Sequence, residues 1–195
     1  MILLKKIGIL GGTFNPPHIG HLMMANEALH ALGLEEVRFM PNNVPPHKET
    51  SGATNAERLE MVRLAIADNP QFVVEPFEIE EGGVSYTYET MKKLVVREPD
   101  CMFYFIIGGD SVQNLHTWYK IDELVQLVHM VGVKRPSSTA STTYPVQMID
   151  APEIDLSSTL VRERFKTGGT VHYLVPQSVE AYIREEGLYG STKLS

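Results

Sequence analysis

The sequence predicts an α/β fold: a doubly wound, mostly parallel open sheet flanked by helices, with a small C-terminal helical part. Two observations carry this prediction. Apolar segments rich in Val, Ile and Phe alternate along the chain with segments of helical periodicity, which is typical of parallel α/β sheets. The apolar segments are also nearly continuous, as at 103–107, which indicates strands that are buried on both faces.

The predicted elements follow one another in regular order. Strands are expected at residues 6–10, 36–40, 72–75, 102–107, 129–133 and 145–149. Helices are expected at residues 19–32, 55–68, 86–97, 122–127, 158–166 and 177–186. Thr54 and Glu57 form a capping box before the second helix, and Pro176 and Gly187 flank the last helix. This Rossmann-like arrangement binds ligands beyond the carboxyl ends of its strands.

Composition limits the classes of function. The 195 residues suggest one domain, at 1–190, with a frayed tail at 191–195. The net charge of −7 argues against a general nucleic-acid or membrane-surface protein, and no run reaches the length of a membrane span. The single cysteine excludes an intrachain disulfide and favours the cytoplasm. A second copy of the chain is a partner that the sequence leaves open.

The segment 11–21 follows the first predicted strand and has the composition of a phosphate cradle. Gly11 and Gly12 end the strand and would let the backbone approach a ligand closely. Thr13, Phe14 and Asn15 belong to the turn that follows. A helix then opens with His18 and His21, three residues apart and therefore on one helical face. The N-terminus of that helix would attract an anion.

Several alternative interpretations of this segment were considered. The glycines do not form G-x-G-x-x-G, and the Walker phosphate loop is absent from the chain. His18 and His21 could be half of a metal site, but such a site needs further ligands, and Cys101 belongs to a different apolar run. We therefore predict no metal site on the protein. Structural roles for the glycines and histidines remain an alternative at this point.

Other polar segments follow the ends of predicted strands. Asp110, behind Gly108 and Gly109, could cap the next helix or accept hydrogen bonds from ribose hydroxyls. Ser157, Ser158 and Thr159 precede a helix, where their hydroxyls could cap it and face an anion, and Arg162 lies one turn further on. The segment with His47 and Lys48, and Arg135, lie after the second and fifth strands. The segments of His18 and His21, of His47 and Lys48, of Gly108–Asp110 and of Arg135 are expected at one edge of the sheet.

Four blocks together resemble a known family. The 11–21 segment matches the H-x-G-H signature of a nucleotidyltransferase superfamily, and Pro45–Lys48, Gly108–Asp110 and Ser157–Thr159 with Arg162 match further blocks of the bacterial nicotinate-mononucleotide adenylyltransferases. Trp118 and Tyr119 lie between the third and fourth blocks. The resemblance extends from about residue 7 to residue 189. Many bacterial members have Asp where this chain has Asn15, and Asn keeps the side-chain acceptor.

The resemblance implies transfer of AMP from ATP to nicotinate mononucleotide, by direct in-line attack, giving deamido-NAD and pyrophosphate. It implies catalytic roles for His18, His21, Lys48 and Arg162. It implies that ATP is bound by Gly11, Gly12, Thr13, Phe14, His21, Gly108, Asp110, Ser157, Ser158, Thr159 and Arg162. It implies that the mononucleotide is bound by Asn15, His47, Lys48, Tyr86, Thr87, Trp118, Tyr119 and Arg135. Because the chain has no acidic cluster for a metal, Mg²⁺ is expected to arrive on the ATP phosphates.

Three other functions are consistent with part of these sequence features. Adenylylation of phosphopantetheine or another phosphorylated acceptor would use the same motifs, and Trp118 is the main feature against it. An aminoacyl-tRNA synthetase would share the His-Ile-Gly-His sequence but needs room and a basic surface for tRNA. A non-catalytic nucleotide-binding regulator would need neither both histidines nor Arg162.

Overall fold

A parallel six-stranded sheet forms the centre of the molecule in the computed structural model, which describes residues 4–43, 52–134, 142–152 and 154–191. The strands are β1 (Lys5–Gly12), β2 (Glu36–Pro41), β3 (Phe72–Val74), β4 (Cys101–Gly108), β5 (His129–Val133) and β6 (Val146–Ile149). Their order across the sheet is β3-β2-β1-β4-β5-β6, and every pair is parallel. This is the doubly wound order of a Rossmann-type sheet.

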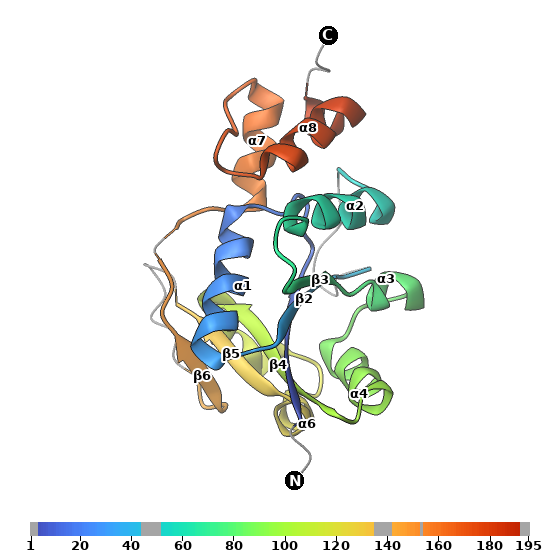
Figure 1. Cartoon of the computed structure of the whole chain (residues 1–195), viewed down its shortest axis with the longest axis vertical. Helices are drawn as coiled ribbons and strands as arrows, with labels where there is room; N and C mark the ends of the chain where they lie inside the picture. The colour runs from blue at the N-terminus through green and yellow to red at the C-terminus, as the bar shows by residue number, and fades with distance from the viewer. Residues whose placement is uncertain (1–3, 44–51, 135–141, 153, 192–195) are drawn as a thin grey trace.

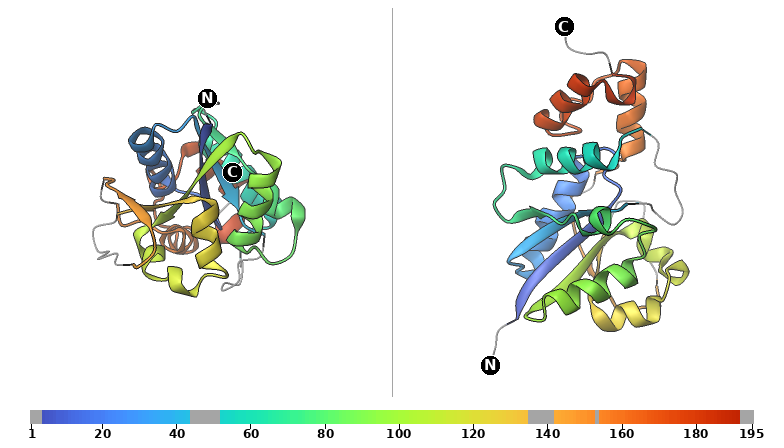
Figure 2. Two further views of the ribbon diagram at one scale, coloured as in Figure 1. Left: turned by 90° about the horizontal axis from the view of Figure 1, so that it is seen from below. Right: turned by 90° about the vertical axis from the view of Figure 1, so that its right-hand side faces the viewer.

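Helices cover both faces of the sheet, because neighbouring strand residues point to opposite sides. Leu10, Tyr104 and Ile106 pack with residues of α1 (Ile19–Leu32) and α2 (Asn55–Ile66) on one face. Ile9 and Phe105 pack on the other face with α4 (Thr87–Arg97), α5 (Gly109–Gln113), the 3₁₀ turn η1 (Leu115–Thr117) and α6 (Ile121–Leu127). In the left panel of Figure 2, α1 and α4 lie on opposite sides of the sheet. The α3 helix (Phe77–Glu81) follows β3.

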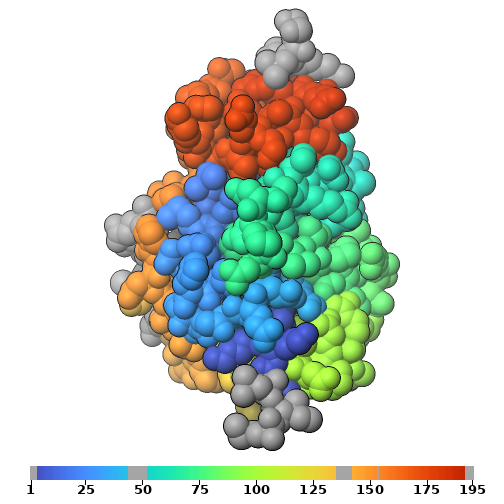
Figure 3. Space-filling view, in the orientation of Figure 1, coloured from blue at the N-terminus to red at the C-terminus, as the bar shows by residue number. Residues whose placement is uncertain are grey.

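The C-terminal part consists of α7 (Ser158–Thr167), α8 (Gln177–Glu186) and the 3₁₀ turn η2 (Leu188–Gly190). These elements lie at the end of the molecule opposite the N-terminus, beyond the carboxyl ends of the strands (Figure 1). In the space-filling view they form a layer stacked on the segments of α1 and α2 (Figure 3). Val161, Val179 and Ile183 belong to the same apolar cluster as α1 and α2. The C-terminal helices are therefore packed onto the sheet domain through a shared core.

The prediction of an open α/β sheet with a small C-terminal helical part is confirmed. The expected ends of α1 and α8 agree with the structure, and Thr54 and Glu57 form the predicted capping box. Four helical segments were not predicted, namely α3, α5, η1 and η2, and each has at most five residues. In the described segments, no helix is both long and apolar enough to cross a membrane.

Candidate functional site

The carboxyl ends of β1 and β4 meet where the order of strands reverses. These strands are adjacent, with Leu10 opposite Ile106, and their connections leave toward opposite halves of the sheet. Gly12 ends β1 and Gly108 ends β4. Ligands of open α/β sheets bind in the crevice at such a switch point. The predicted 11–21 segment thus lies where the topology alone places a ligand site.

Gly11 and Gly12 have a packing role at the end of β1. A Cβ on Gly11 would lie 2.9 Å from Cζ of Phe105, and a Cβ on Gly12 would lie 3.0 Å from Cζ of Phe14. Phe14 has a positive φ of 49° and is buried, so its ring folds back over Gly12. The Phe14 ring also meets the His21 ring edge-on, with centroids 5.0 Å apart. The glycines therefore allow aromatic rings to close over the strand end.

His18 and His21 open α1 as a stacked pair. His18 is the N-cap residue and is buried, whereas His21 is half-buried. Their ring centroids are 3.7 Å apart with planes inclined by 25°. The backbone N–H of His18 donates to Nδ1 of His21 at 3.1 Å. Because Nδ1 of His21 is an acceptor, the proton of its neutral ring is on Nε2, which makes that atom a donor.

Asn15 is held from two sides by the C-terminal part. Arg162 of α7 donates from Nη1 to the carbonyl oxygen of Asn15 at 2.8 Å. The Tyr189 hydroxyl donates to Oδ1 of Asn15 at 2.5 Å. Ser158 donates from Oγ to the carbonyl of Pro16 at 2.8 Å. These bonds bring α7 and η2 onto the turn between β1 and α1, although Asn15 and Arg162 are 147 residues apart in sequence.

Arg58 of α2 contacts this turn, and its role was not predicted from the sequence. Its side chain is fully buried and donates to the carbonyls of Thr13 at 2.7 Å and of Asn42 at 2.5 Å. Burial lowers its pKa, yet an arginine remains charged. The available signal was its position, because Arg58, Met61 and Val62 share the buried face of α2. A charged residue on an apolar helical stripe indicates a specific buried partner.

The three hydroxyls at the start of α7 all have partners within the protein. Ser157 is the N-cap, and its side chain accepts from the N–H of Leu160. Ser158 bonds to Pro16, and Thr159 accepts from Nη2 of Arg162 at 3.2 Å. The prediction that these hydroxyls cap the helix is thus confirmed for Ser157. An anion at this helix would meet backbone N–H groups and the other donors of the Arg162 guanidinium.

Asp110 is exposed in the first turn of α5. The expectation that it could cap the following helix is wrong, because the helix begins at Gly109 and its N-cap is Gly108. Gly109 is buried, and Asp110 faces outward near the carboxyl end of β4. This placement leaves the second predicted role, contact with ribose hydroxyls, as a prediction.

The predicted aromatic residues form two neighbouring contacts. Trp118 is half-buried and meets Phe105 edge-to-face, with centroids 6.0 Å apart. Tyr86, which precedes α4, and Tyr119 are exposed, and their ring centroids are 4.8 Å apart. The structure therefore brings together the segments of Tyr86 and Tyr119, which are far apart in the sequence. Thr87 is the first residue of α4.

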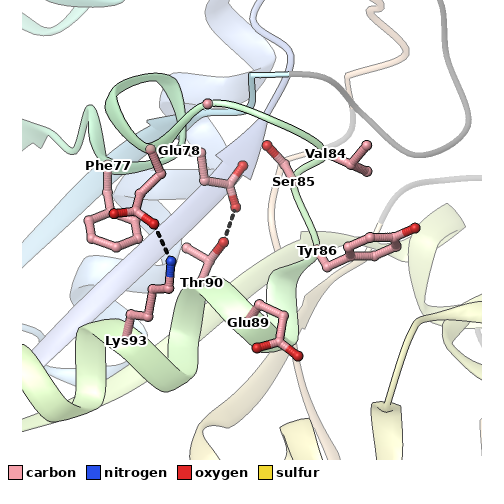
Figure 4. Close-up of a pocket in the computed structure, with 10 residues that line it drawn as sticks. Phe77, Glu78, Val84, Ser85, Tyr86, Glu89, Thr90 and Lys93 are labelled. Atoms are coloured by element: carbon pink, nitrogen blue, oxygen red, sulfur yellow. Dashed lines mark hydrogen bonds and ion pairs between the residues drawn. The ribbon is translucent and has the colours of Figure 1, made fainter.

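A small, open cavity of about 70 Å³ lies beside Tyr86, between α3 and α4 (Figure 4). Glu78 and Thr90 point toward each other in its wall, and Thr90 donates to Oε1 of Glu78 at 2.8 Å. Burial raises the pKa of Glu78 above its ordinary value. Lys93 pairs with Glu81 at the rim. The lining of the cavity does not include the histidines, and it carries three carboxylates, from Glu78, Glu81 and Glu89.

Three predicted site residues, His47, Lys48 and Arg135, lie outside the described residues. Within the described ranges, no group of three His, Cys, Asp or Glu side chains is arranged to hold a metal ion. Of the remaining predicted residues, Arg162 and Ser158 hydrogen-bond to the 11–21 segment.

Comparison with known proteins agrees with this arrangement. The family model described as cytidylyltransferase-like matches residues 9–164. A probable nicotinate-nucleotide adenylyltransferase of Geobacillus kaustophilus is 54% identical over 95% of this chain and 87% of its own length. The nicotinate-nucleotide adenylyltransferase of Bacillus subtilis is 50% identical over 96% of this chain and 100% of its own length. A solved structure of Plasmodium falciparum nicotinic acid mononucleotide adenylyltransferase, complexed with NaAD, has the same fold. Its TM-score is 0.82 at 20% identity, and the match covers 95% of this chain and 98% of that one.

Proposed function

This chain belongs to the nicotinate-nucleotide adenylyltransferase family of nucleotidyltransferases, and from that membership we propose its reaction. The enzyme transfers AMP from ATP to nicotinate mononucleotide, and the products are deamido-NAD and pyrophosphate. We also propose that it acts in the cytoplasm, where its single cysteine stays reduced.

One structural observation supports this proposal above the others. Arg162 and Ser158 of α7 hydrogen-bond to the turn that carries the H-x-G-H residues at the switch point. The N-termini of α1 and α7, which both attract anions, are therefore joined at this turn. A polyphosphate that is broken between its α- and β-phosphorus needs such groups on both sides of the break.

The histidines are proposed to act on the α-phosphate. Nε2 of His21 carries the ring proton, because Nδ1 accepts the backbone N–H of His18. A donor fixed in this way stabilises negative charge as it builds on the phosphate oxygens, without reorganising first. The stacked ring of His18 restricts the orientation of His21. Lys48 is proposed to orient the phosphates as well.

Arg162 and the start of α7 are proposed to hold the departing pyrophosphate. The guanidinium is fixed at Nη1 by Asn15 and at Nη2 by Thr159. Its planar fork therefore has a set direction, which suits recognition of phosphate oxygens. The N-terminal N–H groups of α7, next to Ser157, Ser158 and Thr159, add donors for the same anion. Mg²⁺ carried by the ATP phosphates would neutralise part of the charge that these residues must meet.

The acceptor is proposed to occupy the neighbouring region near Trp118. Its phosphate is already ionised, so it can attack the α-phosphorus in line and no protein nucleophile is needed. Trp118 would stack on the pyridine ring, and Tyr86, Thr87 and Tyr119 would border it. His47, Lys48 and Arg135 complete the proposed acceptor contacts. On the adenylate side, Gly11, Gly12, Thr13 and Phe14 would face the nucleotide, and Gly108 and Asp110 would face its ribose.

The proposal is tested by product analysis with the purified chain. ATP and nicotinate mononucleotide together should yield deamido-NAD and pyrophosphate in equal amounts. ATP alone should release no pyrophosphate, because direct attack requires the acceptor. A burst of pyrophosphate from ATP alone, in proportion to enzyme, would show a covalent adenylyl-enzyme and contradict the proposed mechanism. The absence of the dinucleotide with both substrates would contradict the proposed function.

A further inference from the structure

Tyr189 reaches the turn between β1 and α1 from the far end of the chain. It belongs to η2, directly after α8, and its backbone has a positive φ of 57°. Its half-buried ring lies beside Phe165 of α7, with centroids 6.3 Å apart. From there its hydroxyl donates to Oδ1 of Asn15 at 2.5 Å. This hydrogen bond links η2 to the turn between β1 and α1.

Asn15 is the shared partner of Tyr189 and Arg162. Its amide oxygen accepts from Tyr189, and its backbone carbonyl accepts from Nη1 of Arg162. Asn15 is buried, with 5% of its surface exposed. The bond to Oδ1 anchors the side chain of Asn15, and this anchor restrains the backbone of the residue whose carbonyl accepts from Arg162. The direction of the Arg162 guanidinium therefore depends on a residue that Tyr189 holds in place.

We propose that Tyr189 is a positioning residue for ATP binding, acting through Asn15 on Arg162. This inference rests on the proposed function, because it assigns to Arg162 the pyrophosphate part of ATP. It also gives the side chain of Asn15 a structural partner in place of the acceptor contact that the family resemblance implies. The role assigned to Tyr189 involves no direct contact with either substrate.

The Tyr189 hydroxyl can donate this hydrogen bond independently of the assay pH. Burial raises its pKa above the ordinary value of a tyrosine. The hydroxyl therefore stays protonated at every pH at which the enzyme can be assayed, and it remains a donor. The neighbouring Gly52 leaves room for the ring, because a Cβ at that position would lie 2.9 Å from Cε1 of Tyr189.

The test compares Tyr189→Phe, Asn15→Ala and the double variant with the wild type. Each single variant removes one side of the same hydrogen bond, so both should raise the KM for ATP by a similar factor, roughly three- to tenfold for one hydrogen bond. The double variant should cost no more than either single one. The KM for nicotinate mononucleotide should stay within about twofold of the wild-type value, by the same measure. Tyr182→Phe is the matched control, because Tyr182 is a half-buried tyrosine of α8 that makes no side-chain hydrogen bond with the described residues.

Three outcomes would overturn the proposal. One is a KM for ATP in Tyr189→Phe equal to that of Tyr182→Phe. Another is an Asn15→Ala variant that raises the KM for the mononucleotide and not for ATP. The third is full additivity in the double variant. Should Tyr189→Phe not fold, Asn15→Ala tests the bond from its other side. If the wild type makes no dinucleotide, the proposed function has failed, and calorimetric titration with ATP still tests the Tyr189 effect.

Discussion

At the start of α1, a backbone hydrogen bond fixes which nitrogen of the His21 ring carries the proton. Nδ1 of His21 accepts from the backbone of His18, and this leaves Nε2 as the donor in the neutral ring. A histidine that contacts charge only as it develops contributes to turnover more than to binding. His21 therefore has the properties of a transition-state contact.

We expect His21→Ala to lower kcat by roughly 100-fold or more, corresponding to about 3 kcal/mol for one lost oxyanion-type donor. The KM for ATP should change much less. Steady-state kinetics with circular dichroism of the purified variant measure this. His30→Ala is the matched control, since His30 is an exposed histidine in the last turn of the same helix. Near wild-type turnover in a folded His21→Ala enzyme would remove His21 from the reaction.

Trp118 packs against the core and is also proposed to contact the acceptor, and a substitution distinguishes these two roles. Its ring packs edge-to-face on Phe105, so it contributes to the apolar layer under α6, yet it is only half-buried. We expect Trp118→Ala to raise the KM for nicotinate mononucleotide, because a stacking contact is worth roughly 1–3 kcal/mol. The KM for ATP should stay nearly unchanged. Trp118→Phe keeps an aromatic ring and should recover part of the affinity. An unchanged mononucleotide KM in Trp118→Ala would place this ring in the core alone.

Individual residues differ in how far the sequence reveals them. The two histidines could be predicted, because their spacing and the preceding strand are local features. Tyr189 could not, because its partner Asn15 is 174 residues away and no local pattern records that contact. Arg58 was missed for the same reason, although its place on the buried face of α2 was a usable signal. The expectation that Asp110 could cap α5 was wrong, because this helix begins one residue before Asp110.

Between elements, a group of ion pairs joins β2 to the end of α4. Arg38 of β2 donates to both carboxylate oxygens of Glu98 at 2.7 Å, and Arg97 also bonds to Glu98. Arg38 and Arg97 further share Glu75, which is buried after β3. The hydrogen bond from Arg38, opposed by burial and aided by Arg97, lowers the pKa of Glu98 to about 2. These contacts connect the sheet to a helix on its face.

We expect this pairing to stabilise the fold above the ordinary pKa of a glutamate, 4.5, and to lose its effect as pH falls toward about 2. The sign follows from the depressed pKa, because the unfolded chain takes up the Glu98 proton at a higher pH than the folded chain does. Glu98→Gln should therefore lower the free energy of unfolding most at neutral pH. Urea unfolding at several pH values measures the difference between variant and wild type. Glu60→Gln, in an exposed ion pair with Arg63, is the control. A difference that does not shrink in acid would contradict the role given to the Glu98 charge.

Elements differ in their predictability for a physical reason. The long helices α1 and α8 have apolar periodicity and cap signals, such as Gly187 at a positive φ of 68°, and their bounds could be predicted. The short segments α3, α5 and η1 complete fewer than two turns, so they show no helical period. The packing of α7 against the β1–α1 turn could not be predicted from residues 157–162 alone. It depends on Ser158 and Arg162 meeting carbonyls of residues 15 and 16.

At the scale of the whole molecule, two arginines lie at the turn that begins α1 in a protein that is acidic overall. The formal net charge is −7, yet Arg58 and Arg162 both donate to the turn that begins α1. Within the described segments, no ion pair joins Arg58 to a carboxylate. The α1 and α7 N-termini add their positive dipole ends to the same region. A polyphosphate would therefore be attracted to this region rather than to the surface in general.

The order of the strands and the C-terminal layer together account for the position of the site. The order of the strands reverses between β1 and β4, and α7 and η2 are hydrogen-bonded to Asn15 in the turn that follows β1. The switch point could be predicted from the alternation of strands and helices. Nicotinate mononucleotide as the acceptor was expected from the family resemblance alone, because no residue spacing or periodicity in the sequence specifies an acceptor.

The most direct test of the account is a comparison of kcat/KM for three acceptors at one saturating ATP concentration. The acceptors are nicotinate mononucleotide, nicotinamide mononucleotide and phosphopantetheine, and pyrophosphate release measures all three in one assay. The account predicts the highest value for nicotinate mononucleotide, a lower one for its amide and no turnover above background for phosphopantetheine. Equal use of the acid and the amide would contradict the proposed selectivity, and preference for phosphopantetheine would contradict the proposed function itself.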